Sequence, residues 1–410
     1  MNNPKAKLYF VDGDGKKYPN STPMPLSEIA EIKRGNGLSK SAIVSDGKYL
    51  CILYGQLFSL YGTKIEKVLS ATNTQTSVLS KKGDILMPTS DVTSSGLATA
   101  SSLLVNDVLL GGDMNIIRPS NIVNSIFLAY YIRHNKKPIM DSVTGSTVKH
   151  IYPKDLAKIV YRIPSLPEQE KIAEFLSALD DRIDLQSKKI DLLIEQKKGY
   201  SQKIFSREFV FKDDNGNSYG EWNNAPLSNL IVIGKSGGTP SSTNSSYYHG
   251  PIPFLSIADM SNQGKYISRT EKTLTQEGLD SSSAWVVPRH SLIYAMYASV
   301  GKVAFNTVEM ATSQALFAMQ LDEKQVHSEY VYQYLAFFKT NGLDAHITTG
   351  TQGNINASTL KSFNIPLPTL KEQTKIIGLL SALDKSLTLE QQKIELLKEQ
   401  KQGYMQRIFE

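Results

Sequence analysis

The chain has 410 residues, of which 40% are hydrophobic and 20% charged, and its formal net charge is +6 at pH 7. This length and balance predict two or three globular domains of a soluble protein, and the longest apolar runs are too short to span a bilayer. The single cysteine, Cys51, excludes an internal disulfide framework and a cysteine-rich zinc site and favours a reducing cytoplasm, whereas the small basic excess is only weak support for a nucleic-acid partner.

Residues 1–165 are predicted to form a first globular α/β domain. Strand-like runs at 49–54, 83–87 and 115–118 alternate with glycine and serine turns, and a helical stretch at 125–133 follows them. The long polar loops of this half offer hydroxyl groups, backbone N–H groups and cationic side chains, which suit contact with DNA phosphates, although each loop could equally be plain solvated surface. The candidate DNA-binding residues here are Lys33, Arg34, Lys40, Thr89, Ser90, Thr144, Ser146 and Lys149.

Residues 166–206 are predicted to form one long helix. Apolar or large side chains recur in alternating steps of four and three, which is the heptad pattern of a coiled coil. At about 1.5 Å per residue, 38 helical residues extend for roughly 57 Å, which is far longer than an ordinary core helix. The seam residues of this helix are Ile172, Leu179, Ile183, Ile190, Leu193 and Lys197.

Residues 207–367 are predicted to form a second α/β domain with a late helix at 328–338. Its polar loops again combine Gly, Ser, Thr, Lys and Tyr, so the same kind of phosphate contact is expected. The candidate DNA-binding residues of this half are Lys235, Gly238, Thr239, Ser241, Tyr247, Tyr248, Lys302, Thr349, Thr351, Gln352 and Asn354.

Residues 368–410 repeat the long helix. Between residues 168–205 and 372–409, 22 of 38 positions are identical without a gap, at a constant separation of 204 residues. The likeness continues weakly into the start of each half, but between these anchors the halves share no run that can be aligned. The two halves therefore share the long helix and the start of the domain, and they differ in sequence in the globular part between these two. The seam residues of the second helix are Leu383, Leu387, Glu390, Ile394, Leu397 and Lys401.

The polar seam positions predict how the two helices pair. A parallel pair would place Lys197 on Lys401, whereas one antiparallel register places Lys197 opposite Glu390 and Gln186 opposite Lys401. The predicted fold is therefore α+β: two α/β globular domains separated by two long antiparallel coiled-coil helices, with an internal pseudo-two-fold repeat.

The known sequence motifs for catalysis and metal binding that we considered are incomplete or missing in this chain. Residues 234–236 resemble the end of a phosphate-binding P-loop, but position 229 is Asn where the motif needs glycine. Residues 12–15 resemble the start of a calcium loop, but Lys17 stands where glycine is required. The histidines show no metal-ligand spacing, and both the serine-hydrolase elbow and the amino-methyltransferase motif are missing. No catalytic residue, metal site or cofactor is predicted on this chain.

The residues carry a family resemblance over nearly the whole length. The Pro…Glu-Gln-x-x-Ile entry at 167–172 and 368–376 and the Ser-Ala-Leu-Asp stretches at 177–180 and 381–384 resemble the specificity (S) subunit of type I restriction-modification systems. The runs at 83–90, 111–119 and 237–241 look like its target recognition domains. The resemblance implies a cytoplasmic, non-catalytic subunit. It also implies two modification subunits that bind the long helices and methylate adenine N6 with S-adenosylmethionine, and restriction subunits that cleave DNA with ATP and Mg²⁺.

Physical reasoning agrees with this expectation. Two dissimilar DNA-reading domains on one chain should recognise an asymmetric bipartite DNA target, and a rigid rod between them should fix the spacer between its halves. One alternative is a coiled-coil scaffold that binds proteins, not DNA, at its two globular ends. Another is an enzyme with a fused specificity module, against which the missing motifs argue.

Overall fold

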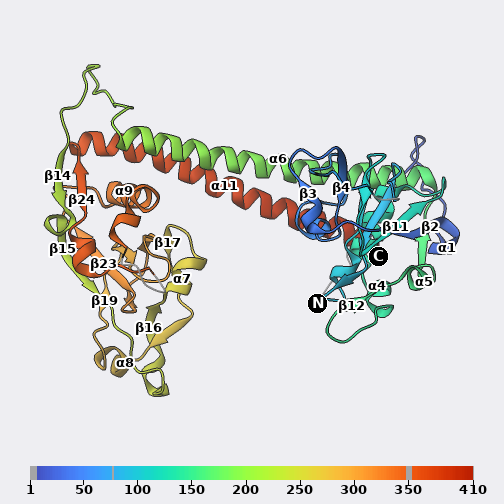
Figure 1. Ribbon diagram of the computed structural model, residues 1–410. Coiled ribbons are helices and arrows are strands. Elements are labelled where there is room, and N and C mark those ends of the chain that lie inside the picture. The colour runs from blue at the N-terminus through green and yellow to red at the C-terminus, as the bar shows by residue number, and fades with distance from the viewer. Residues whose placement is uncertain (1–6, 76–77, 348–352, 410) are drawn as a thin grey trace. The chain divides into compact units, whose positions relative to one another are not determined.

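A computed structural model describes residues 7–75, 78–347 and 353–409 (Figure 1). The chain divides into two compact units, unit 1 (residues 1–188 and 392–410) and unit 2 (residues 189–391). The long helices α6 (Leu166–Phe205) and α11 (Leu370–Phe409) each contribute one part to either unit. In the described ranges, no helix is both long enough and apolar enough to cross a membrane.

Unit 1 is built around a five-stranded sheet that is mostly antiparallel. In spatial order its strands are β2 (Ala30–Arg34), β11 (Met114–Pro119), β7 (Asp84–Pro88), β9 (Ser101–Leu103) and β5 (Lys64–Ile65). The Arg118 guanidinium on β11 joins β7 by donating to both carboxylate oxygens of the fully buried Asp84, at 2.7 and 2.8 Å. The smaller sheets pair β10 (Leu109–Leu110), β4 (Tyr49–Ile52), β6 (Ser70–Thr72) and β3 (Ile43–Val44), then β1 (Thr22–Pro25) with β13 (Val160–Ile163), and β12 (Lys149–His150) with β8 (Ser90–Asp91).

Unit 2 repeats this architecture although the two halves cannot be aligned in sequence. Its five-stranded sheet has the same spatial order: β15 (Ile231–Ser236), β23 (Leu316–Leu321), β20 (Leu292–Ala295), β21 (Val303–Asn306) and β17 (Tyr266–Ile267). A four-stranded sheet joins β18 (Lys272–Leu274), β16 (Tyr248–Leu255), β22 (Met310–Thr312) and β19 (Val286–Val287), and β14 (Asn223–Pro226) pairs with β24 (Asn364–Leu367). The globular parts of the two halves therefore share one topology of the five-stranded sheet, although their sequences differ.

Shorter helices complete each unit. They are α1 (Leu26–Ile29), α2 (Gln56–Ser59), α3 (Ser125–His134), α4 (Lys137–Asp141) and α5 (Pro153–Leu156) in unit 1, and α7 (Ile257–Asn262), α8 (Gln276–Asp280), α9 (Ser328–Asn341) and α10 (Ala357–Lys361) in unit 2. The two helices and the strands predicted from the sequence are present, with ends that differ by up to three residues. In unit 2, α9 lies between the sheet and the long helices (Figure 1), and its Tyr330 and Leu335 are fully or almost fully buried.

A buried glutamine explains part of the sequence repeat. Gln169, with no exposed surface, donates from Nε2 to the Pro164 carbonyl at 2.8 Å and accepts from the Asn124 N–H at 2.9 Å. The second copy makes the same bonds, from Gln373 to the Pro368 carbonyl at 2.9 Å and from the His327 N–H to Gln373 at 2.8 Å. Each glutamine therefore joins the first turn of a long helix to the start of α3 or α9, because buried backbone groups need partners.

The antiparallel pairing of α6 and α11 is confirmed, but the predicted register is wrong by about one heptad. In unit 2, Lys197 Nζ lies 2.5 Å from Asp384 Oδ1, and Glu390 pairs instead with Lys189. In unit 1, Lys401 Nζ lies 2.5 Å from Asp180 Oδ1, six residues before the predicted Gln186.

The packing of the C-terminal ends of α6 and α11 into the cores of the units explains this register. A heptad shift keeps the same side chains in the seam, so the seam alone cannot select between the two registers. The C-terminal ends of both helices enter the unit cores: Ile408 packs into the core of unit 1, and Ile204 packs into that of unit 2. This packing fixes the register. All twelve predicted seam residues are buried or half-buried.

Candidate nucleic-acid interface

One edge of the unit 1 sheet gathers the candidate residues of the first half. β2 ends there at Arg34, which pairs in register with Asn115, and β7 ends there at Pro88, which pairs with Met114. The loops that follow β2 and β7 and the loop that precedes β11 therefore leave the sheet at the same edge. Side chains far apart in the sequence, in the thirties, near 90 and near 113, come together because of this antiparallel arrangement.

Hydrogen bonds and an ion pair hold this loop cluster in place. Arg34 Nη2 lies 3.9 Å from Asp113 Oδ1, and the Thr89 N–H donates to the Asp113 carbonyl at 2.9 Å. β12 pairs with β8, so that Lys149 lies beside Asp91, and the Lys149 ammonium donates to the Gly145 carbonyl at 2.8 Å. The structure thus brings together most of the predicted residues of the first half. They are Lys33, Arg34, Ser90, Thr144, Ser146 and Lys149, each exposed or half-buried.

Thr89 is a correction to the predicted interface. Its side chain is only 2% exposed, because the residue lies between β7 and β8, where its carbonyl accepts from the Ile151 N–H at 3.0 Å. A hydroxyl covered in this way cannot touch a phosphate. Its role is to hold the loops together, and polar composition alone could not distinguish it from the neighbouring Ser90.

Beside this cluster lies a cleft of about 680 Å³, lined by Lys40 together with Tyr54, Gly112 and Asp113. Tyr54 is 38% exposed and Asp113 has a positive φ of 56°. Sequence reasoning missed both residues, because a tyrosine at the end of a strand-like run reads as part of a core. The Gly-Gly pair before Asp113 was the available signal for an unusual turn.

Unit 2 places its candidates at the equivalent sheet edge. β15 ends at Ser236, which pairs with Phe317, and β20 ends at Ala295, which pairs with Leu316. Lys235 lies 5.8 Å from the centre of the Trp285 ring. Three hydrogen bonds order the loop that follows β15. They join Thr239 to Gln314, Ser241 to Thr243 at 2.8 Å, and the Tyr248 hydroxyl to the Pro240 carbonyl at 2.7 Å. The predicted Tyr247 immediately precedes Tyr248.

Lys302 and Asn354 belong to the same edge of unit 2. The Lys302 carbonyl accepts from the Ala295 N–H at 2.9 Å, and the residue after Asn354 donates its N–H to the Met296 carbonyl at 3.1 Å. Burial lowers the pKa of the Lys302 ammonium, which donates to the Ser261 carbonyl at 3.1 Å. The predicted residues Thr349, Thr351 and Gln352 lie outside the described ranges.

Gly238 is a second correction. The residue is buried, and its N–H donates to the Thr312 carbonyl at 3.0 Å. A Cβ at this position would lie 2.5 Å from the Ala284 backbone nitrogen. The glycine is therefore needed for close packing of two backbone segments and offers no surface to DNA.

The family model for the type I restriction modification DNA specificity domain matches the chain twice, at residues 20–196 and 219–399. The chain belongs to this specificity family. Each match spans one globular part and most of one long helix, so the pseudo-repeat seen in the sheets and helices is a repeat of the specificity domain.

Proteins that are similar to this chain are specificity subunits of type I restriction enzymes. The chain is 27% identical to the putative type I restriction enzyme MjaX specificity subunit of Methanocaldococcus jannaschii, over 73% of this chain and 70% of that protein. It is 30% identical to the MjaIX specificity subunit of the same organism, over 47% of this chain and 45% of that protein. The crystal structure of a type I restriction-modification S subunit from M. genitalium shares the fold, with a TM-score of 0.62, 14% identity and 99% coverage of both chains.

Two further observations on the described residues concern metal binding and thiol chemistry. Across residues 7–75, 78–347 and 353–409, no group of three or more His, Cys, Asp or Glu side chains could hold a metal ion. The thiol of Cys51 is buried, and burial raises its pKa above the ordinary value, which disfavours the reactive thiolate.

Proposed function

We propose that each specificity domain of this chain reads one half of an asymmetric, bipartite DNA target. The observation that supports this is the equivalence of the two sheet edges. Equivalent strands end at the two edges in the same spatial order, whereas the loops that connect them carry different side chains. Equal frames present both loop clusters to DNA in the same way, and unequal side chains read different bases.

The side chains at the two edges suit this division. The cations at the edge of unit 1, Lys33, Arg34 and Lys149, are suited to phosphate contact, and the neighbouring hydroxyls and Asp113 can bond to bases. The edge of unit 2 combines Lys235 and Lys302 with aromatic and amide groups. The scaffold alternative, in contrast, gives no reason for cations to gather at equivalent edges.

The long helices are the proposed docking sites for two modification subunits. Leu185 and Leu192 on α6 are both 65% exposed, and their equivalents 204 residues later, Leu389 and Leu396 on α11, are 55% and 54% exposed. Large apolar side chains left in water at repeated positions indicate binding to the same partner twice. In this proposal the partners carry the chemistry: adenine-N6 methylation with S-adenosylmethionine, and DNA cleavage with ATP and Mg²⁺ on restriction subunits. The chain itself is a non-catalytic cytoplasmic subunit, and the helix length sets the spacer.

Methylome sequencing tests the reading function. The chain is co-expressed with the modification subunit of its own system, and methylated adenines are mapped by single-molecule sequencing. We expect one asymmetric bipartite motif. Loop substitutions at residues 33–40 should change only one half of the motif, and substitutions at residues 239–243 should change only the other. Changes in the same half from both sets would refute the assignment.

Native mass spectrometry tests the docking surface. The wild-type chain should bind two modification subunits, Leu185→Lys should reduce the number to one, and Leu185→Lys with Leu389→Lys should abolish binding. The matched control is Asp184→Lys with Thr388→Lys, one position earlier on each helix and also exposed. Retention of two partners by the double leucine variant, or equal loss in the control, would contradict the proposal.

A further inference from the structure

One carboxylate at the interface edge of unit 1 has little use within the chain. Asp113 lies immediately before β11, and 61% of its side chain is exposed. Among the described residues, no hydrogen bond reaches its carboxylate, and its ion pair with Arg34 spans 3.9 Å. DNA is a polyanion, so an exposed carboxylate at a DNA-binding edge repels the phosphates unless it accepts hydrogen bonds from the bases.

Another carboxylate of this loop cluster is already used within its own loop. Asp91 Oδ1 accepts from the Val92 N–H at 2.7 Å, and Asp91 Oδ2 accepts from the Thr93 hydroxyl at 2.7 Å. Both oxygens of Asp91 therefore order the loop after β7. The two oxygens of Asp113 have no such partners among the described residues and are open to a ligand.

The backbone that carries Asp113 is fixed by neighbouring loops. The Gly111 N–H donates to the Ile52 carbonyl at 2.9 Å, and a Cβ on Gly35 would lie 1.9 Å from the Gly111 carbonyl oxygen. The loops after β2 and before β11 therefore touch through their backbones. Asp113 itself has a φ of 56°, a left-handed conformation that aspartate adopts more readily than most residues. A fixed turn that presents an exposed side chain lowers the entropy cost of binding.

Arg34, at the end of β2, is the cation that faces this carboxylate, and 48% of its side chain is exposed. If Arg34 bound a phosphate, Asp113 would be brought close to the same negative charge. Base edges remove this conflict. Guanine N7 and O6 accept two N–H groups from one guanidinium, and the cytosine N4 amino group donates to a carboxylate.

The spacing of the two side chains fits the major-groove edge of one G·C pair. Guanine O6 and cytosine N4 are hydrogen-bonded to each other within the pair, so they lie about 2.9 Å apart. An arginine nitrogen on O6 and a carboxylate oxygen on N4 can therefore lie side by side at the observed separation of 3.9 Å. In an A·T pair the N6 donor lies between the N7 and O4 acceptors, so the guanidinium finds no two adjacent acceptors.

We propose that Arg34 and Asp113 together read one G·C base pair in the half of the DNA target that unit 1 recognises. Arg34 donates to guanine N7 and O6, and Asp113 accepts from the N4 amino group of the paired cytosine. The inference rests on the proposed function of this sheet edge and names the base pair that two of its residues read. Lys33 and Lys149 are left for the phosphates.

Methylation by the assembled complex of this chain with the modification subunit of its own system tests the pair. The wild-type motif is mapped by single-molecule sequencing, and duplexes with each base pair of the motif replaced in turn are then methylated. We expect Arg34→Gln and Asp113→Asn to lower discrimination at one and the same G·C pair by roughly fivefold or more. Asp113→Asn should also tighten binding to DNA without the motif, because it removes a negative charge beside the phosphates.

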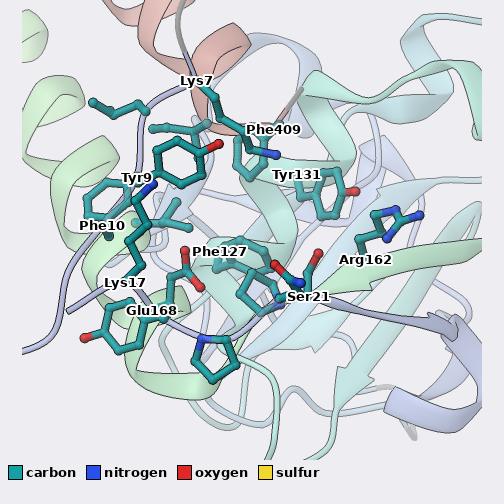
Figure 2. A pocket seen from close by; sticks show the side chains of 17 residues that line it. Lys7, Tyr9, Phe10, Lys17, Ser21, Phe127, Tyr131, Arg162, Glu168 and Phe409 are labelled. Carbon is teal, nitrogen blue, oxygen red and sulfur yellow. The ribbon is translucent and has the colours of Figure 1, made fainter.

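The matched controls are an arginine and an aspartate of unit 1 away from this edge. Arg162 is exposed and lines a separate cavity of about 170 Å³, to which none of the loop residues of the edge contributes (Figure 2). Asp107 is exposed, has a similar φ of 60°, and follows β9, which ends at the opposite edge of the sheet beside Asp84. Arg162→Gln and Asp107→Asn should leave discrimination unchanged at every position.

Four results would overturn the proposal. They are a first half-site without a G·C pair, unchanged discrimination in both edge variants, effects of the two edge variants at different base pairs, and an equal loss in a control. In each case, a bipartite motif whose halves respond to separate sets of loop substitutions would still support the proposed function. Failure of this inference is therefore distinguishable from failure of the proposed function.

Discussion

Alanine substitution of Lys197 and Asp384, singly and together, tests the register of the helix pair. Each side chain is 20% exposed, and their charged atoms are 2.5 Å apart. Hydrogen bonds between charged groups contribute about 1.5–3 kcal/mol when shielded, and residual exposure reduces this through screening. We therefore expect a coupling free energy of about 1–2 kcal/mol between these two positions.

The effect of a single substitution does not give the free energy of the Lys197–Asp384 ion pair by itself. Asp384 Oδ2 also accepts from Gln333 Nε2 at 2.8 Å, and Gln333 is only 2% exposed. Asp384→Ala therefore leaves a buried amide without its acceptor and costs a further 1–3 kcal/mol, roughly, in addition to the loss of the ion pair. The double-mutant cycle removes this contribution, since it is present in both variants that lack Asp384.

The control cycle uses Lys197 and Glu390, the pair expected from the alternative register. Glu390 pairs with Lys189, so the coupling with Lys197 should stay below about 0.5 kcal/mol. Unfolding in urea is followed by tryptophan fluorescence, which reports on unit 2 alone because both tryptophans of the chain, Trp222 and Trp285, lie there. A larger coupling for Lys197 with Glu390 than with Asp384 would refute the register.

Three further predictions follow from the two sheets. Arg118→Ala should destabilise unit 1 by about 3 kcal/mol in calorimetric unfolding, because its fully buried aspartate partner loses its counter-charge; an effect below 1 kcal/mol, roughly, would count against this ion pair. Lys149→Ala should lower the salt slope of DNA binding by about 1 in the assembled complex, whereas Lys82→Ala, two residues before β7 begins and so at the opposite edge of the sheet, should not; equal slopes for both variants would argue against the edge as the interface. Gly238→Ala should destabilise unit 2 by about 1–3 kcal/mol, as read by tryptophan fluorescence, and Gly264→Ala, whose Cβ would meet open space, serves as its control.

The sequence was sufficient to predict the frame because the frame is repeated. The copies of the long helix, with heptad spacing and proline near each start, predicted α6 and α11, and the clash of Lys197 with Lys401 in a parallel pair predicted their antiparallel pairing. The exact register was not predictable, since a heptad shift preserves the seam, and only contacts of Ile204 and Ile408 with the cores decide it. The common strand order of the two sheets was also hidden, because many different side chains can support one sheet topology.

The candidate interface was partly predictable for a related reason. Lysine and hydroxyl-rich loops identified segments that the fold brings to one sheet edge, and residues 33–34 and 235 are found there. Composition could not show that Thr89 and Gly238 face inward, since burial depends on partners from other strands. Tyr54 and Asp113 were missed because only the assembled loops place them beside a cleft.

The division of the helices between the units determines the order in which the protein is completed during synthesis. Unit 2 is one continuous stretch of chain, residues 189–391, whereas unit 1 also needs residues 392–410. Ile408 packs in the core of unit 1, and the Arg407 carbonyl accepts from the Leu8 N–H at 2.9 Å. Unit 1, whose first part the ribosome makes first, is therefore expected to finish folding after unit 2, and removal of residues 392–410 is expected to damage unit 1 while leaving unit 2 intact.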